Sequence, residues 1–435
     1  MANNTSNTAN DQQGYTLVEL LVAITLGLLL SAAVVQSYMA TRQTSRITEG
    51  VSRVQENARF GLHFLTTDIR DAGYSGCIGQ IRNKLNGDPS DFLSFKAPIQ
   101  GWEYTGTATG DSGDNAFELS GIPLHVPSES SAWGQASGGS SANLPTSLVG
   151  RVVAGSDVIY FKNFVELDLI IKKHTDSSAP IVVQSPHGLE DKSILLVGNC
   201  SEAELFQHLS NGSGNQVSVT ASEGNGHNEP GNRQTGSTKS WSRDYDFNDT
   251  FFGFKQTYFY IGQGASGLPS LFRYSSGLPL SAETPKVFSS NLEELVEGVE
   301  TMQLLYGEDL TGDDNPNRYV SAHQVSDWNA IVSVRVGLLM MSPNAATDQD
   351  QSEALGTAYT LLDGIEFTHA IDDLTLRYAL NNTIKLRNRG LDDNLAYFIC
   401  DAVDEDKDEA DNGIDTCATA SVGGGGMGGG NGDGN

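Results

Sequence analysis

The stretch Gly14-Tyr-Thr-Leu-Val-Glu-Leu20 decides the fold, because it opens a long apolar run with a single acid at its start. From Leu20 to Thr41 there are twenty-two consecutive residues without a charged side chain. As an α-helix this run spans about 33 Å at roughly 1.5 Å per residue, enough to cross the hydrocarbon core of a bilayer. Glu19 stands where a carboxylate is costly without a partner. The run predicts a membrane-spanning helix in which Glu19 needs a counter-charge.

The apolar pattern continues beyond this run as a stripe on one helical face. The stripe residues, spaced three or four apart, are Ile47, Val51, Val54, Ala58, Leu62, Leu65 and Ile69. No proline interrupts the chain before Gly87. The spacing predicts one helix from about Tyr15 to Ala72 that stops at Gly73, about 85 Å long. Its first half is apolar all round and its second half is amphipathic, so we expect only the second half to pack on a folded body.

The residues Gly-Tyr-Thr-Leu-Val-Glu-Leu-Leu-Val-Ala-Ile at positions 14–24 resemble the leader junction of type IV pilins and type II secretion pseudopilins. The resemblance implies that a prepilin peptidase cuts between Gly14 and Tyr15 and methylates the new amine of Tyr15. It also implies that Glu19 pairs with the N-terminal amine of a neighbouring subunit, which would stabilise a buried carboxylate. The alternative is an ordinary signal anchor or a cleaved secretory signal, and neither explains an acid at this position.

The charges around the apolar run permit a second interpretation of its orientation. Residues 1–14 contain no basic residue and one acid, whereas pilin leaders usually carry Lys or Arg before the glycine. Arg42, Arg46 and Arg53 follow the run. The positive-inside rule alone would therefore place the C-terminal side in the cytoplasm. The junction motif and the cysteines favour an exported body instead.

Composition narrows the class of protein. The chain has 435 residues, a formal net charge of -28 and a pI near 4.4, which argues against binding to a nucleic-acid phosphate backbone. Its four cysteines, Cys77, Cys200, Cys400 and Cys417, have no zinc-type spacing and allow three pairings. In an exported body an even count indicates disulfides. Pairing by region predicts Cys77–Cys200 and Cys400–Cys417, the first worth about 4–5 kcal/mol in the chain-entropy model.

The body is rich in β-strand signals and long loops. Strands are predicted at 157–161, 167–171, 181–183, 194–197, 257–261, 271–274, 299–306, 331–341 and 378–387. Residues 80–150 are predicted to be irregular, and 209–250 to form a polar loop. Ser201–His208 has the capping pattern of a short helix. Beyond Gly390 the chain becomes acidic and then almost entirely glycine, which cannot form a core.

Several body segments are similar to PilW-type minor pilins. They are Phe64–Cys77, Cys200 with Glu204-Leu-Phe206, Glu297–Gln303, Trp328 with Val332–Val336, and Leu386–Arg389. The resemblance implies an α+β pilin fold, in which a long N-terminal helix packs on an antiparallel sheet with large loop insertions. The expected segments are a leader at 1–14, a membrane or filament-core half of the helix at 15–42, its amphipathic half at 43–73, a periplasmic α+β domain at 74–390 and a tail at 391–435.

The sequence carries little that indicates enzymatic or metal chemistry. Gly110-Asp-Ser-Gly113 resembles the sequence around the nucleophile of a serine protease. The catalytic triad of such a protease needs a histidine earlier in the chain, and the only one here lies on the predicted helix. We therefore expect no enzymatic activity and no cofactor. One calcium candidate alternates oxygen-bearing side chains at Asp309, Thr311, Asp313 and Asn315. Val320 occupies the closing position where a glutamate would be needed, so a solvated turn is the alternative.

The expected function is structural. The resemblance implies a minor pilin that is held in the inner membrane with its body in the periplasm, then primes pilus assembly and sits at the extracellular tip. The implied partners are other minor pilins, the major pilin, a large tip adhesin and the prepilin peptidase. Two alternatives stay open: a minor pseudopilin of a type II secretion system, and a tip-located module that binds a ligand or calcium as an adhesin.

Overall fold

The computed structural model describes part of the chain. The described residues are 15–388 except 79–80, 86–96, 106, 108–116, 119–132, 135, 138–139, 142–143, 146–147, 173, 175, 177–178, 190–192, 209–213, 218–230, 233–240, 277–290, 346–357, 363 and 370–374. Gly14, Gly110–Gly113, Cys400, Cys417 and the predicted tail lie outside the described residues.

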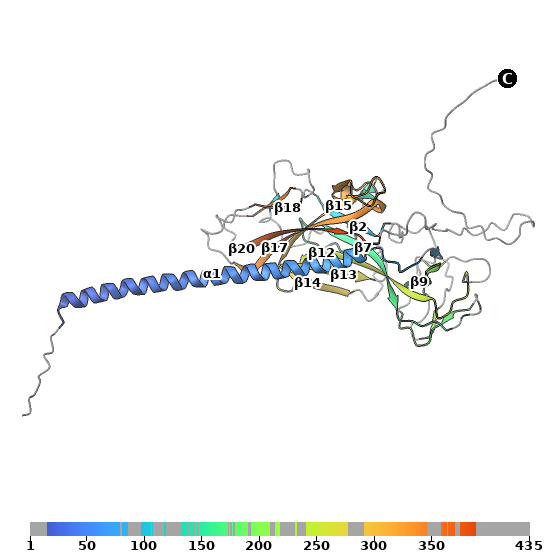
Figure 1. Cartoon of the computed structure of the whole chain (residues 1–435), viewed down its shortest axis with the longest axis horizontal. Helices are drawn as coiled ribbons and strands as arrows, with labels where there is room; N and C mark the ends of the chain where they lie inside the picture. Colours follow the sequence, from blue (N-terminus) through green and yellow to red (C-terminus); the bar gives the residue numbers. More distant parts are fainter. Residues whose placement is uncertain are drawn as a thin grey trace, which may run out of the picture.

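One long helix, α1 (Leu17–Asp71), begins the fold and projects far beyond the body (Figure 1). Thr16 caps its N-terminus, and Ala72 is the C-terminal cap residue. The chain then turns at Gly73, whose φ of +76° lies in the left-handed region that favours glycine. The predicted helix is thus confirmed to within two residues at its start and one at its end.

The larger of two main sheets has nine strands in the order β1-β10-β9-β12-β7-β2-β4, with β13 paired to β12 and β14 paired to β13. Its pairings are antiparallel except that β1 runs parallel to β10. Its strands are β1 (Ile81–Asn83), β2 (Ile99–Tyr104), β4 (Trp133–Gly134), β7 (Val158–Leu167), β9 (Ile194–Gly198), β10 (Ala203–Gln207), β12 (Thr250–Gln263), β13 (Pro269–Ser276) and β14 (Asn291–Glu297).

The second main sheet is antiparallel, with the order β16-β15-β17-β20. Its strands are β15 (Val299–Glu308), β16 (Arg318–Val320), β17 (Ile331–Ala345) and β20 (Thr375–Lys385). Smaller sheets and two 3₁₀ turns comprise β3 (Phe117–Glu118), β5 (Ala136–Ser137), β6 (Ser140–Ser141), β8 (Ile181–Val182), β11 (Gln216–Val217), β18 (Ala358–Leu361), β19 (Ile365–Thr368), η3 (Ala322–Gln324) and η4 (Trp328–Ala330). The architecture is α+β, as the sequence predicted.

The short helix predicted at Ser201–His208 is wrong, because the segment forms strand β10. All five residues of β10 are buried, whereas a short surface helix would expose one face. The strand pairs with β9 on one side and with β1 on the other, so its backbone groups are used in the sheet. The sequence pattern indicated a locally capped helix, but hydrogen bonding to the two neighbouring strands stabilises the extended conformation instead.

Other sequence expectations need smaller corrections. The segment 80–150, predicted to be irregular, contains β2, which includes the buried Trp102. The strand predicted at 167–171 is not formed, because β7 already ends at Leu167, where its pairing with β12 stops. Within the predicted polar loop 209–250, Trp241 and Tyr245 are buried and pack in a core cluster.

The largest apolar core lies between α1 and the two main sheets. Its buried members from the helix and from the larger sheet include Val54, Ala58, Leu65, Ile69, Ile159, Phe161, Phe259, Ile261 and Leu271. Its members from the smaller sheet include Met302, Leu304, Tyr306, Val334, Val336, Leu338, Met340 and Ile384. The amphipathic half of the helix thus joins both sheets, and burial of these side chains is the main favourable term for its attachment.

Candidate functional site: the N-terminal helix and its attachment

The start of α1 is fixed by a reciprocal cap between Thr16 and Glu19. The Thr16 hydroxyl accepts a hydrogen bond from the Glu19 backbone N–H at 3.2 Å, and the Glu19 carboxylate accepts one from the Thr16 N–H at 3.2 Å. This capping box satisfies two N–H groups that a helix start leaves without partners. The negative charge of Glu19 also interacts favourably with the positive N-terminal end of the helix dipole. The carboxylate predicted to pair with a neighbouring amine therefore lies beside the backbone of Thr16.

The first half of α1 is exposed on every side. Residues 15–42 are all exposed, and large apolar side chains such as Leu17 and Leu30 expose 74% and 70% of their surface. By length and composition the helix can cross a membrane. An apolar surface of this extent in water is a strong indication of a lipid or protein environment. The exposed half agrees with the segment predicted from the uncharged run.

The second half of α1 buries one stripe against the body. Its buried residues are Val54, Ala58, Gly61, Leu65 and Ile69, which follow the predicted spacing. A Cβ placed on Gly61 would lie 3.5 Å from Leu338 on β17 and 3.9 Å from Leu271 on β13. The helix therefore contacts a strand of each main sheet at the same level, and both sheets hold it.

Polar contacts fix the register of the helix on the edge strand β14. Asp68 forms an ion pair with Arg273 of β13 at 3.1 Å, and the Nε of Arg273 donates to Glu293 of β14 at 2.9 Å. Nearer the exposed half, the Asn57 amide donates to the Glu297 carbonyl at 2.9 Å. Sequence reasoning missed the two contacts of the helix, because they join residues 205 and 240 positions apart.

The end of α1 is tied directly to strand β7. The Gly73 N–H donates to the Lys162 carbonyl at 2.8 Å, and the Phe164 N–H donates to the Tyr74 carbonyl at 2.7 Å. Just beyond, Gly76 has a φ of +72° and approaches the Phe252 ring so closely that a Cβ there would lie 3.0 Å from the ring. The turn after the helix is therefore positioned by a central strand of the larger sheet.

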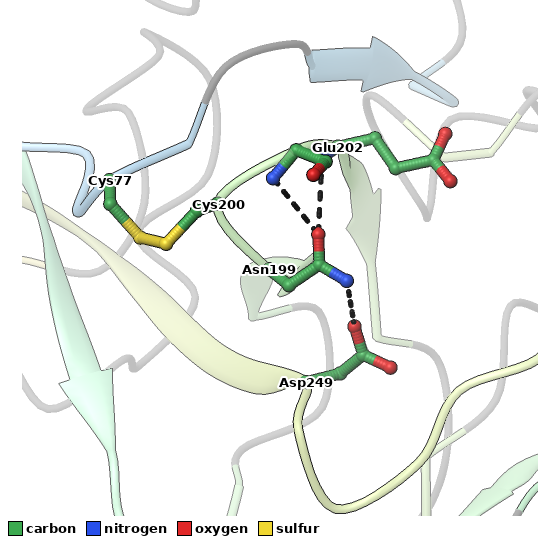
Figure 2. The surroundings of a disulfide bond; sticks show 6 residues. Cys77, Asn199, Cys200, Glu202 and Asp249 are labelled. Carbon is green, nitrogen blue, oxygen red and sulfur yellow. Dashed lines mark hydrogen bonds between the residues drawn. A yellow bond between two sulfur atoms is a disulfide. The ribbon is translucent and has the colours of Figure 1, made fainter.

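A disulfide closes this turn onto the β9–β10 hairpin. Cys77 and Cys200 are bonded, as predicted, and their Cα atoms are 4.7 Å apart (Figure 2). The pairing predicted for Cys400 and Cys417 lies outside the described residues. The bridge joins the chain just after α1 to the end of β9, and so links the helix to strands that its apolar stripe does not touch.

The turn that carries Cys200 has its own hydrogen bonds (Figure 2). The Asn199 side-chain oxygen accepts bonds from the N–H groups of Ser201 at 3.0 Å and Glu202 at 3.4 Å, and its amide donates to Asp249 at 3.0 Å. Asp249 in turn accepts from Arg243 at 3.1 Å. This network holds Cys200 in place without help from the disulfide. In the sequence, the Asn at position 199 was the available signal for this turn, because Asn side chains accept hydrogen bonds from the backbone that follows them.

A groove of about 450 Å³ lies between α1 and the edge strand β14, close to where the helix leaves the body. Its lining includes Arg53, Asn57, Phe60 and Phe64 of the helix and Leu295 of β14. The Phe60 side chain is half exposed. The groove is thus an accessible surface of mixed polar and apolar character that continues along the helix from its exposed half.

The calcium candidate is a backbone-stabilised turn. The Asp309 carboxylate accepts hydrogen bonds from the N–H groups of Thr311, Gly312, Asp313 and Asp314 at 3.1, 2.7, 3.3 and 2.8 Å. Its oxygens are therefore already engaged, and the set does not fit a ready calcium cage. Among the residues that the structure describes, no group of three or more His, Cys, Asp or Glu side chains could hold a metal ion. Calcium binding stays an untested prediction.

Two family models match the chain. The Prokaryotic N-terminal methylation motif matches residues 9–35, which include Gly14, Tyr15 and Glu19. Type IV Pilus-assembly protein W matches residues 258–388, from within β12 to just past β20. Together the two matches support a type IV pilin of the PilW type. No curated protein and no solved structure shows significant similarity to it.

The two matches agree with the architecture of the molecule. The methylation motif covers the start of the exposed apolar helix, as expected for a membrane-anchored pilin. The assembly-protein match covers all of the smaller main sheet, which holds the amphipathic half of α1. Both point to a structural protein of pilus assembly that interacts with other pilus components.

Proposed function

We propose that this PilW-type pilin is a minor pilin that primes type IV pilus assembly and remains at the pilus tip as a structural subunit. The observation that supports the proposal best is the division of α1 into an exposed apolar half and a half held by both sheets. A helix of this kind can stay in the inner membrane and later pack among other pilin helices, while the body remains outside. In this role the protein performs no catalysis.

In the proposed pathway the prepilin peptidase cuts after Gly14, and the methylated amine of Tyr15 becomes the new N-terminus. The body lies in the periplasm before assembly and outside the cell at the tip afterwards. Glu19 pairs with the amine of a neighbouring pilin, and in the free subunit its cap with Thr16 keeps the carboxylate hydrogen-bonded until that partner arrives. The other minor pilins, the major pilin and a large tip adhesin are the proposed partners.

The test replaces Glu19 with Ala in the full-length protein. We expect normal insertion into the inner membrane, reduced co-purification with the other minor pilins and fewer surface pili. Glu49→Ala is the matched control, since Glu49 is exposed on the same helix and forms an ion pair with Arg53 on the next turn, at 3.0 Å. Wild-type pilus number and co-purification in the Glu19 variant would contradict the proposal.

A further inference from the structure

Two arginines follow the point where the uncharged run of α1 ends. Arg42 is the first charged residue after Thr41, and Arg46 lies about one helical turn further on. From Glu19 to Arg42 the helix axis extends about 35 Å, at roughly 1.5 Å per residue. The hydrocarbon core of a bilayer is about 30 Å thick. A helix that crosses it with Glu19 near one boundary therefore brings Arg42 and Arg46 to the lipid headgroups at the other.

The two arginines share a face of α1 with Tyr38, and this face does not point at the body. The three residues are spaced four apart, which places their side chains on one side of an α-helix. The buried stripe that begins at Val54 lies roughly 100–180° away around the axis, at about 100° per residue. All three side chains are exposed, and Tyr38 exposes 61% of its surface. The face is therefore open to the surroundings of the helix.

Among the residues that the structure describes, neither Arg42 nor Arg46 has an acidic partner. The next acid along the helix, Glu49, forms its ion pair with Arg53 at 3.0 Å. Arg42 instead lies over the ring of Tyr38, with its Cζ atom 5.7 Å from the ring centroid, within the range of a cation–π interaction. The chain has 54 acidic and 26 basic residues, and yet these two guanidinium groups are left to bind an anion from outside the described part of the molecule.

A lipid phosphate is the anion that fits this arrangement. A guanidinium group presents a planar fork of N–H donors that matches phosphate oxygens, and it can stack on an aromatic ring while it donates to them. The stem of an arginine can lie along an apolar helix surface while its charged end stays among the headgroups. Tyrosine is enriched at the same depth of the membrane. An anionic lipid adds a net negative surface potential that a zwitterionic lipid lacks, so it should bind more tightly.

We propose that Tyr38, Arg42 and Arg46 bind the headgroup of an anionic phospholipid at the boundary where α1 leaves the membrane. Tyr38 positions the Arg42 guanidinium, and both arginines donate hydrogen bonds to the phosphate. The site fixes the depth of the helix in the bilayer. The choice of leaflet rests on the proposed function, because a periplasmic body places the site at the periplasmic face of the inner membrane. The preference for anionic lipid does not depend on this orientation, so it can fail while the proposed function stands.

The test measures the lipid preference of the full-length protein in micelles of a neutral detergent. Phosphatidylglycerol and phosphatidylcholine are titrated separately, and native mass spectrometry gives a dissociation constant for each. One arginine near an anionic lipid strengthens binding about fivefold, so the wild type should prefer phosphatidylglycerol by roughly 25-fold. Arg42→Gln and Arg46→Gln should each reduce this preference about fivefold, and the double variant should bind the two lipids with nearly equal affinity.

Arg59→Gln is the matched control, because Arg59 is also an exposed arginine of α1. It lies about 20 Å beyond Arg46 along the helix axis, more than twice the screening length of about 8 Å at physiological salt. The control should therefore keep the wild-type preference. Raising the salt concentration to about 1 M should weaken the preference of the wild type, since screening acts on exposed charges. All three substituted side chains are exposed, so the folded body should be unaffected.

Several results would overturn the proposal. Equal affinity of the wild type for the two lipids would do so without any variant. An equal loss of preference in Arg59→Gln would show a general effect of net charge and no site at Arg42 and Arg46. Displacement of phosphatidylglycerol by millimolar glycerol 3-phosphate would indicate a site for soluble phosphate. If the wild type showed no lipid preference and the double variant lost co-purification with the other minor pilins, the face would belong to a protein contact instead.

Discussion

Loss of the Cys77–Cys200 disulfide should destabilise the whole body by a large and calculable amount. The bonded residues are 123 positions apart in sequence, so the closed loop is long. In the chain-entropy model, a loop of this length contributes about 5 kcal/mol at 25 °C by restricting the unfolded chain. The folded state should change little, because Asn199 holds the turn at Cys200 and Phe252 contacts the turn at Gly76. The effect therefore acts mainly through the unfolded state.

The variant for this measurement is Cys77→Ser/Cys200→Ser, which leaves no unpaired partner to exchange with Cys400 or Cys417. Urea unfolding of the full-length protein in micelles, followed by tryptophan fluorescence, should show a midpoint lower by about 1.7 M if the m-value is roughly 3 kcal/mol per M. Each single serine variant should lose as much as the double, since they remove the same bond. A loss below about 1 kcal/mol, or additive losses from the singles, would refute the reasoning. Serine at Cys400 or Cys417 should leave the midpoint unchanged.

Three further predictions address processing, packing and pH. Replacing Gly14 with a bulkier residue should leave the leader attached, whereas mass spectrometry of the mature wild type should find N-methylated Tyr15; an intact first residue in assembled pili would contradict this. Leu65→Ala removes a fully buried side chain between α1 and the sheets and should cost about 2–5 kcal/mol of unfolding free energy, measured by denaturant titration. Burial raises the pKa of Glu308, but hydrogen bonds from Ser326, Asp327 and Arg318 outweigh it and hold the pKa below its usual value. Its stabilising contribution is therefore present above about pH 4.5 and lost below, and Glu308→Gln should remove that part of the acid sensitivity.

The elements with strong local patterns were predictable from the sequence. The helix followed from an unbroken three-and-four spacing, and its end from Gly73, which adopts a positive φ. The long strands β12, β15 and β17 followed from runs of β-branched and aromatic residues. Each of these depends on neighbours within a few positions, so local propensity and the final fold agree.

The rest depended on contacts between distant parts of the chain. Strand β10 could not be distinguished from a capped helix without knowing that β1 and β9 lie on either side. The division into two sheets depends on the segment around Asp157, whose partners lie about 50 and 147 positions away. The junction motif predicted Gly14, Tyr15 and Glu19 without any structure, because their proposed roles are set by local sequence.

The unbroken course of α1 from its exposed half into the body determines how a pulling force would travel through the molecule. Tension along the helix axis would reach the body as shear, because α1 lies alongside β14, β17 and β20, the strands that it contacts (Figure 1). The packed side chains would have to slide together, so they share the load and do not fail one after another. Beyond Gly73 the force would pass to β7, which is flanked by β2 and β12 and cannot be peeled from an edge. A molecule built in this way resists extraction along its helix axis even where the individual contacts are weak.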